Sequence, residues 1–149
     1  MYKHILVSTD GSKLSRKAIV TAVNLARAVG ARVTGVYVIP PYTPPIYSEA
    51  LMYAPAGASP SGYRETVKRE GKKALAVLEI EAQAAGVESR EAMLAAPTPW
   101  EGIIRTAKSK KCDLIVMASH GRQGLSGLLL GSETAKVLTH SMTPVLVCR

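Results

Sequence analysis

Apolar and polar positions follow two different spacings in turn along this chain. Short apolar runs, typical of buried strands, are separated by segments in which apolar residues recur every three or four positions, as on one side of a helix. The apolar runs predict strands at residues 3–9, 32–39, 87–95, 112–119 and 144–148. The segments between them predict helices at residues 13–29, 63–85, 99–109 and 132–141.

This alternation predicts a single α/β domain over residues 1–149. A strand returns to a parallel neighbour through a right-handed, usually helical crossover, so the order favours a doubly wound parallel sheet with helices on both faces. The first and fourth runs are almost wholly apolar, as central strands are. Ligands of such sheets bind outside the carboxyl ends of the strands, where the winding direction reverses. If these two strands are the neighbours at that point, Asp10 and the loop that begins at Gly121 face each other across one crevice.

Capping residues support the predicted boundaries of two helices. Ser12 is suited to begin the first helix, because its hydroxyl can accept a hydrogen bond from an unpaired backbone N–H, and Gly30 is suited to end it. Thr98, Pro99 and Glu101 fit a capping box with proline at the first helical position. We therefore expect a helix to begin directly after Thr98.

A glycine-rich loop lies between the fourth predicted strand and the last predicted helix. Residues 121–132 contain four glycines and end at Ser132, where the helix is expected to begin. Side chains do not crowd the N–H groups of such a loop, and a helix N-terminus adds unpaired donors and the positive end of the helix dipole. The loop is a candidate phosphate-binding loop, and the alternative is a flexible connection without a ligand. Its place at the expected crevice favours the first interpretation.

The segment from Pro40 to Gly62 does not follow the regular pattern. It contains six prolines together with Tyr42, Tyr47 and Tyr53, and it is too long for an ordinary connection. It is a lid, a partner-binding surface or a mobile loop. Because it follows the carboxyl end of the second strand, it is expected to hang over the crevice, which favours a lid.

The formal net charge of +8 raises the question of nucleic acid. Two groups of cations fit ordinary positions instead, one on the solvent side of the second predicted helix and one in the last turn of the third, where cations complement the helix dipole. The chain has no Phe, and no aromatic stacking motif of RNA-binding domains accompanies the cations. Nucleic acid is therefore not an expected partner, whereas a basic balance can favour a small anionic ligand. The two groups are Lys68, Arg69, Lys72 and Lys73, and Lys108, Lys110 and Lys111.

The two cysteines are expected to be reduced. Cys112 opens the fourth predicted strand and Cys148 closes the fifth, so a parallel sheet separates them by roughly 20 Å at about 3.3 Å per residue, too far for a disulfide. Neither belongs to a Cys-x-x-Cys metal or redox pair. No apolar stretch approaches the roughly 18 residues of a membrane span, and the chain starts in a strand pattern rather than a signal segment. We expect a cytoplasmic protein that does not interact with membranes.

The end of the fourth strand and the glycine-rich loop resemble the nucleotide signature of the universal stress protein family, in its ATP-binding branch. The family pattern is Gly-x-x-Gly, nine residues, Gly, and then Ser or Thr. Here Ala118-Ser-His-Gly121, the nine residues 122–130 and Gly131-Ser132 follow that spacing, with Ala118 in place of the first glycine. Thr9-Asp10 looks like the family's strand-one ending, and Pro144-Val-Leu-Val looks like its last strand. The resemblance covers the whole chain and implies a Rossmann-like sheet of strand order 3-2-1-4-5.

The resemblance also implies ATP, with Mg²⁺, as the ligand. Asp10 would lie near the nucleoside, the backbone of Val38 would meet adenine, and Met117 would border the base and the ribose. A carboxylate can accept bonds from ribose hydroxyls, and a strand-end backbone offers the donor and acceptor that adenine needs. The phosphates would be held by Gly121, Gly131, Ser132 and the backbone of Glu133. The full set of candidate site residues is Thr9, Asp10, Val38, Met117, Ala118, His120, Gly121, Gly131, Ser132 and Glu133.

Each of these residues has a simpler role as an alternative. Asp10 and Ser132 could cap the helices that follow them. His120 fits a phosphate neighbour or a solvent-facing residue better than a general base. Glu133 could complement the helix dipole or face a divalent cation bound beside phosphate. If the position of Ala118 requires a positive φ, alanine costs about 1 kcal/mol or more and weakens binding; if it does not, little changes.

Several enzyme classes lack their motifs in this sequence. There is no Gly-x-x-x-x-Gly-Lys-Ser/Thr loop, so fast ATP hydrolysis is not expected. No Gly-x-Gly-x-x-Gly follows the first strand, as in dinucleotide dehydrogenases, and the Gly-x-Ser-x-Gly of hydrolases does not occur. Ala95 and Ala96 stand where a receiver domain carries its phosphorylated aspartate. We therefore expect a binding protein without catalytic residues.

Two functions of different kinds fit these observations. One is a nucleotide-binding stress-response or signalling module, in which ATP occupancy changes conformation or partner choice. The other is a dimeric interaction protein of the same fold that does not bind nucleotide because of Ala118. Both would form a homodimer through the apolar segment from Thr143 to Arg149, which can pair with its copy around a twofold axis. Slow ATP hydrolysis assisted by His120 or by a metal-bound water is a third hypothesis.

Overall fold

The computed structural model describes residues 1–42, 59–121 and 130–149. Its centre is a five-stranded parallel sheet of order β3-β2-β1-β4-β5, which confirms the predicted fold class and strand order. The strands are β1 (His4–Ser8), β2 (Arg32–Ile39), β3 (Ser89–Ala95), β4 (Leu114–Ala118) and β5 (Val145–Cys148). The helices are α1 (Lys13–Val29), α3 (Pro60–Ala85), α4 (Pro99–Ser109) and α5 (Ser132–His140).

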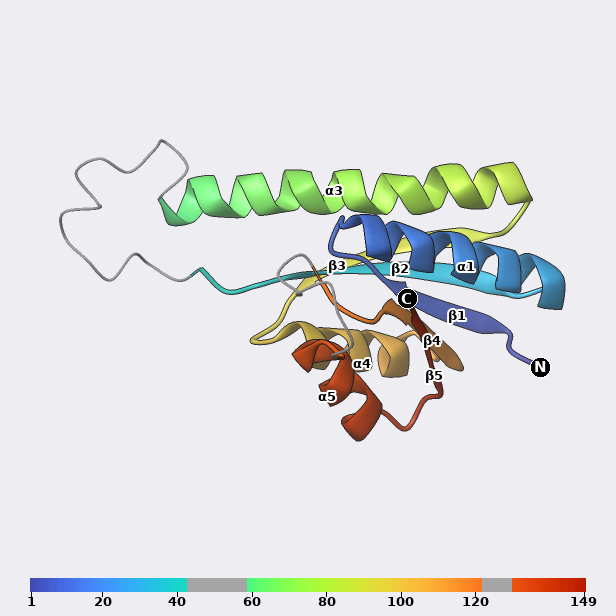
Figure 1. Cartoon of the computed structure of the whole chain (residues 1–149). Helices are drawn as coiled ribbons and strands as arrows, with labels where there is room; N and C mark the ends of the chain where they lie inside the picture. Colours follow the sequence, from blue (N-terminus) through green and yellow to red (C-terminus); the bar gives the residue numbers. More distant parts are fainter. Residues whose placement is uncertain (43–58, 122–129) are drawn as a thin grey trace.

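Helices cover both faces of the sheet, α1 and α3 on one side and α4 and α5 on the other (Figure 1). Alternate residues of β1 divide between two hydrophobic clusters. Ile5 and Val7 pack with the side chains of α1 and with Leu78 of α3, whereas Leu6 packs with Ile103 of α4. Since Ile5, Leu6 and Val7 are wholly buried, β1 has to lie in the middle of the sheet, where both faces are covered.

Several element boundaries differ from the predicted ones by a short distance. α3 begins at Pro60 rather than residue 63, because the Ser59 hydroxyl accepts a hydrogen bond from Gly62 N at 3.1 Å and so caps the helix earlier. β4 begins at Leu114 rather than residue 112, because Cys112 N donates to Ala107 O at 2.8 Å and still belongs to the end of α4. Most of the segment expected to be a lid, residues 43–58, lies outside the described residues.

The caps of α1 are confirmed, and the capping box of α4 is wrong. Ser12 accepts a hydrogen bond from Ser15 N, and Gly30 ends α1 with a φ of 67°. Thr98 occupies the N-cap position of α4, but its side chain makes no capping hydrogen bond. Within the described part of the chain, Thr98 Oγ1 is buried without any hydrogen-bond partner. A residue from another helix binds the start of α4 instead, as described below.

No helix within the described residues is long and apolar enough to cross a membrane.

Candidate functional site

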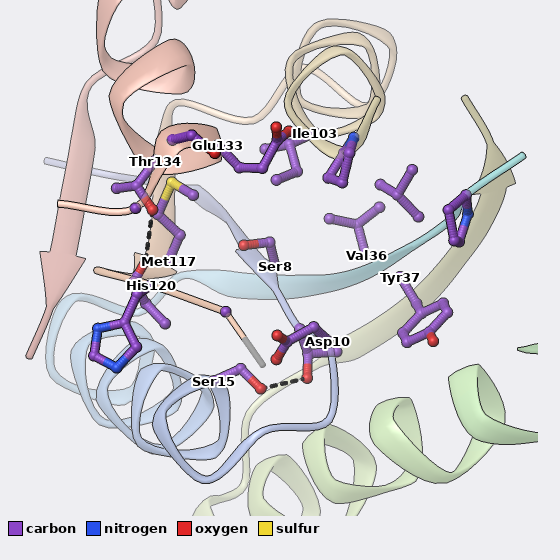
Figure 2. A pocket seen from close by; sticks show the side chains of 18 residues that line it. Ser8, Asp10, Ser15, Val36, Tyr37, Ile103, Met117, His120, Glu133 and Thr134 are labelled. Atoms are coloured by element: carbon purple, nitrogen blue, oxygen red, sulfur yellow. Dashed lines mark hydrogen bonds between the residues drawn. The ribbon is translucent and has the colours of Figure 1, made fainter. Parts of the chain in front are cut away.

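A cavity of about 730 Å³ opens at the carboxyl ends of the central strands (Figure 2). It lies where β1 and β4 are neighbours. The strand order reverses its direction at this point, and α/β sheets of this kind bind ligands there. All ten candidate site residues line it, and the predicted crevice therefore exists in the fold. The residues of the lining that were not predicted are Ser8, Ser15, Val36, Tyr37, Pro40, Pro99, Ile103 and Thr134.

Asp10 and Gly121 lie next to each other in the lining of this cavity, although they are far apart in the sequence. A Cβ atom added to Gly121 would lie 2.9 Å from Asp10 Oδ2, so glycine leaves the room that the carboxylate occupies. Asp10 Oδ1 accepts a hydrogen bond from Ser12 N at 2.9 Å. Asp10 thus supports the turn into α1, while the N-cap is Ser12, which corrects the alternative that Asp10 caps the helix.

Thr9 holds the loop between β1 and α1 rather than pointing a free hydroxyl into the cavity. Its Oγ1 lies 3.1 Å from Ser15 Oγ, the contact drawn in Figure 2, and it accepts a hydrogen bond from Gly11 N at 3.2 Å. Gly11 has a φ of 81°, which explains why glycine occupies this turn. Ser15 lines the cavity from the buried side of α1, and a serine among apolar positions of that helix face was the available signal for it.

One side of the cavity is apolar. Val36 and Val38 of β2, Met117 of β4 and Ile103 of α4 all line it. Helix α4 approaches β2 closely because Gly102 has no side chain: a Cβ there would lie 2.6 Å from Val38 Cγ2. Such a surface suits a flat apolar group. Val36 and Ile103 could have been found from the sequence, since Val36 shares a strand face with Val38 and Ile103 lies on the inward side of its helix.

The start of α5 forms another part of the cavity. Gly131 is the N-cap, and no side chain of the described residues caps the helix. Ser132 is therefore the first helical residue, and the alternative that it caps α5 is wrong. Gly131 N donates to Ser119 O at 2.8 Å, and a Cβ on Gly131 would lie 3.0 Å from both Ser119 O and His120 Cα. Glycine therefore favours close backbone packing here. Within the part of the chain that the structure describes, the first N–H groups of α5 have no side-chain acceptor, as in an anion-binding helix terminus.

Glu133 connects α5 to α4. Its Oε2 accepts a hydrogen bond from Trp100 N at 2.9 Å, which supplies the acceptor that Thr98 was predicted to provide. Its Oε1 lies 3.6 Å from Lys136 Nζ. The described residues contain no group of three His, Cys, Asp or Glu side chains that could hold a metal ion. A divalent cation at this place would therefore depend on ligand phosphates for most of its coordination.

Ala118 carries no backbone strain. It is the last residue of β4 and pairs with Cys148 of β5. Among the described residues, Lys111 is the one non-glycine with a positive φ. The Ala118 carbonyl accepts a hydrogen bond from Thr134 Oγ1 at 3.0 Å, which ties β4 to α5. The cost that alanine would have at a left-handed position therefore does not arise.

His120 is the second residue after β4 and lies at the edge of the cavity (Figure 2). Its Nδ1 is 3.2 Å from Ser119 Oγ. The middle of the glycine-rich loop, residues 122–129, lies outside the described residues.

The described lining of the cavity is acidic. It contains the carboxylates of Asp10 and Glu133, and within the described part of the chain no lysine or arginine lines it. Within this described lining, positive potential comes from helix N-termini rather than from lysine or arginine side chains.

This chain is similar to universal stress proteins along its whole length. The model of the universal stress protein family matches residues 1–149. A universal stress protein of Methanocaldococcus jannaschii is 35% identical over 149 residues, which cover 100% of this chain and 83% of the relative. Universal stress protein YxiE of Bacillus subtilis is 35% identical over 150 residues, which cover 100% of both chains.

Solved structures have the same fold. A protein of the universal stress protein family from Burkholderia pseudomallei superposes with a TM-score of 0.76 at 26% identity, covering 98% of this chain and 95% of that one. A universal stress protein in complex with cAMP superposes with a TM-score of 0.65 at 27% identity, covering 99% and 97%.

Proposed function

Because this chain belongs to the universal stress protein family, we propose that it is a nucleotide-binding stress-response or signalling module, with ATP and Mg²⁺ as its first candidate ligand. One observation carries the proposal. The cavity at the carboxyl ends of β1 and β4 combines an apolar surface with a helix N-terminus that no side chain of the described residues caps. An adenine nucleotide has the matching parts, a flat base and a phosphate group.

Individual residues have distinct parts in this proposal. The base would lie between Val38 and Met117, which line the apolar side. Asp10 lines the cavity and would accept hydrogen bonds from ribose hydroxyls, as carboxylate oxygens can. Phosphate would lie at the start of α5, near Gly131 and Ser132.

A related protein supports the choice of ligand class. The universal stress protein that was solved with cAMP is 27% identical to this chain over nearly its whole length. cAMP contains the same base and ribose as ATP, so binding of an adenine nucleotide in this fold is chemically consistent with the cavity.

We propose binding rather than fast turnover as the activity. His120 is the titratable side chain on the β4 side of the cavity, and its contact with Ser119 Oγ at 3.2 Å is the geometry nearest to a general base. If it assists slow ATP hydrolysis, His120→Ala should lower the steady-state rate. Equal rates for the two proteins would remove that hypothesis.

We further propose that two copies associate through β5. This strand is at the edge of the sheet, so its outer backbone groups have no neighbour within the sheet. Leu146 is 38% exposed and Met142 is 99% exposed, which leaves apolar surface beside that edge. Sedimentation should show a dimer that Leu146→Lys dissociates; a wild-type monomer at high micromolar concentration would contradict it.

Calorimetric titration with ATP and Mg²⁺ tests nucleotide binding, after any co-purified nucleotide has been removed. We expect micromolar affinity for the wild type and about tenfold weaker binding for Ser132→Ala, because a hydroxyl bond to a charged phosphate is lost. Ser109→Ala makes the same chemical change at the far end of α4 and should bind like the wild type. A folded, nucleotide-free protein that binds neither ATP nor AMP would favour the nucleotide-independent interaction protein.

A further inference from the structure

Carboxylates of the protein already occupy two of the helix starts around the cavity. Asp10 Oδ1 accepts a hydrogen bond from Ser12 N at the start of α1. Glu133 Oε2 accepts one from Trp100 N at the start of α4. The start of α5, by contrast, has Gly131 as its N-cap, and no side-chain acceptor from the described residues binds it. Among the residues that the structure describes, the cavity therefore has one helix N-terminus without a carboxylate partner, at α5, and the neighbouring one at α4 already holds a negative charge.

Little positive charge offsets this carboxylate. Lys136 Nζ is 3.6 Å from Glu133 Oε1, but the lysine side chain is 47% exposed, and an exposed pair of this kind is screened by water. No lysine or arginine belongs to the lining that the structure describes. A single phosphate at the start of α5 would be attracted by the dipole of that helix and repelled by the nearby carboxylate of Glu133. Each additional phosphate adds negative charge beside Glu133 without a further cationic partner in that lining.

The position of Glu133 is held by the start of α4. If the carboxylate swings away, Trp100 N loses its acceptor, and Thr98 does not replace it because its hydroxyl makes no capping bond. Losing such a charged cap is unfavourable for the helix. The carboxylate is thus a fixed feature of the cavity and not a side chain that yields freely to a ligand.

We propose that Glu133 makes binding of a nucleoside triphosphate depend on a divalent cation, whereas a nucleoside monophosphate binds without one. This inference rests on the proposed nucleotide-binding function of the same cavity. Phosphate oxygens carry the cation, which neutralises the charge that would otherwise face Glu133. Glu133 is a specificity-determining residue in this scheme, since it selects the cation-bound form of a polyphosphate.

The test measures affinities of ATP and AMP by calorimetry at constant ionic strength, in EDTA and in excess Mg²⁺. For the wild type we expect ATP in EDTA to bind about tenfold more weakly than AMP, and Mg²⁺ to remove most of that difference, as repulsion between charges at short range requires. AMP affinity should change less than about twofold with Mg²⁺. E133Q keeps an acceptor for Trp100 N. In this variant ATP in EDTA should bind only about twofold more weakly than AMP.

Two further variants distinguish a local charge effect from other causes. E79Q makes the same change in net charge on an exposed position of α3 and should behave like the wild type. K136M removes the cation beside Glu133 and should weaken ATP binding in EDTA relative to AMP, in the direction opposite to E133Q but by less, because this exposed pair is screened by water. Thermal unfolding checks that each variant is folded. E133Q and K136M are expected to change the ATP affinity in EDTA in opposite directions, so either variant alone still tests the inference if the other is unstable.

Three results would overturn the inference. ATP and AMP could bind equally in EDTA, or Mg²⁺ could leave the ATP affinity unchanged. In the third, E133Q in EDTA would bind ATP as much more weakly than AMP as the wild type does. In each case AMP binding still stands, so the proposed function survives. If the wild type binds neither AMP nor ATP under any condition, the proposed function fails and this inference fails with it.

Discussion

Two hollows at opposite edges of the sheet have described linings of opposite charge. At the carboxyl edge the cavity is lined by the carboxylates of Asp10 and Glu133, with no lysine or arginine in the lining that the structure describes. At the amino edge a second hollow, of about 510 Å³, is lined by Lys3, Arg27 and Arg32. The one acidic residue of its described lining, Glu88, forms an ion pair with Arg90 at 3.0 Å. An anion would therefore meet acidic side chains in the first described lining and basic ones in the second.

The polarity of the helices explains this difference. Helices of a parallel α/β sheet begin at the carboxyl edge and end at the amino edge, so acids at the first and cations at the second both complement the helix dipole. Arg27 lies in the last turn of α1 and Lys108 in the last turn of α4, whereas Glu133 lies in the first turn of α5. Cations at helix ends thus add to the positive charge of the amino edge, and a ligand of the cavity has to compete with the protein's own carboxylates for helix N-termini.

The largest expected contrast between the edges is the reactivity of their cysteines. Cys112 lies at the amino edge, and burial, together with the neighbouring Asp113, raises its pKa to about 11. About one thiol in a thousand is then ionised at pH 8, whereas Cys148 is only half-buried at the carboxyl end of β5. Iodoacetamide should modify Cys148 at least about a hundredfold faster than Cys112, as measured by peptide mass spectrometry. Similar rates would show that the start of β4 opens readily.

Glycine has a different structural role at each edge, close packing at Gly131 and a positive φ at Gly30, and alanine substitutions should distinguish these roles. Gly131→Ala places a Cβ against the backbone of Ser119 and His120, so we expect a loss of about 1–3 kcal/mol in the free energy of unfolding. Gly30→Ala meets no atom within 4 Å, and its cost of about 1 kcal/mol comes only from the φ of 67°. Urea unfolding measures both. A smaller loss at Gly131 than at Gly30 would contradict the packing argument.

A pH-dependent loss of stability is expected at the amino edge. His4 is buried, its Nε2 lies 2.7 Å from Thr34 Oγ1, and burial together with Arg32 lowers its pKa below 6.5. As the pH falls through 6.5, the unfolded chain binds a proton that the folded chain does not, so the free energy of unfolding decreases; above that pH the contribution is complete. Thermal unfolding between pH 7.5 and 5.5 measures it.

His4→Gln is the matched comparison, because glutamine can still bond to Thr34 Oγ1 but does not titrate. The variant should lose less stability over this pH range than the wild type. Equal losses in the two proteins would assign the effect to other groups.

The smallest effect concerns the start of α4. From the sequence, Thr98 is expected to cap the helix, so its replacement should cost about 1 kcal/mol. In the structure its hydroxyl is buried without a hydrogen-bond partner among the described residues, so Thr98→Val should be neutral or stabilise by up to about 1 kcal/mol. Urea unfolding decides between the two, and a clear loss of stability would mean that Thr98 does cap α4.

The fold could be predicted almost completely from the sequence. The alternation of apolar runs and amphipathic segments is local information, and it fixes the order of strands and helices. Ser12 and Gly30 also act locally, through bonds to residues three or four positions away, and both were predicted as caps. The ten candidate residues line one cavity because the carboxyl ends of neighbouring parallel strands necessarily meet at one edge.

Contacts between separate helices could not be predicted in this way. Glu133 binds Trp100 N across 33 positions of sequence, and nothing in the local pattern of Thr98 indicates that its cap is supplied from α5. The close approach of Gly131 to Ser119 and His120 likewise depends on how α5 packs against the end of β4. The sequence places Glu133 beside the candidate phosphate site, but its bond to the start of α4 depends on how α4 and α5 pack and could not be predicted.

On the proposed function, a nucleotide binds in the cavity at the carboxyl edge of the sheet and not in the basic hollow at the amino edge. Titration of the ¹⁵N-labelled protein with AMP, followed by amide chemical shifts at physiological salt, distinguishes the two places. We expect saturable shifts at Asp10, Gly121, Gly131 and Ser132, with Lys3, Arg32 and Lys110 unaffected. Shifts confined to those three basic residues would show that the ligand follows charge alone, and the proposed nucleotide site would be wrong.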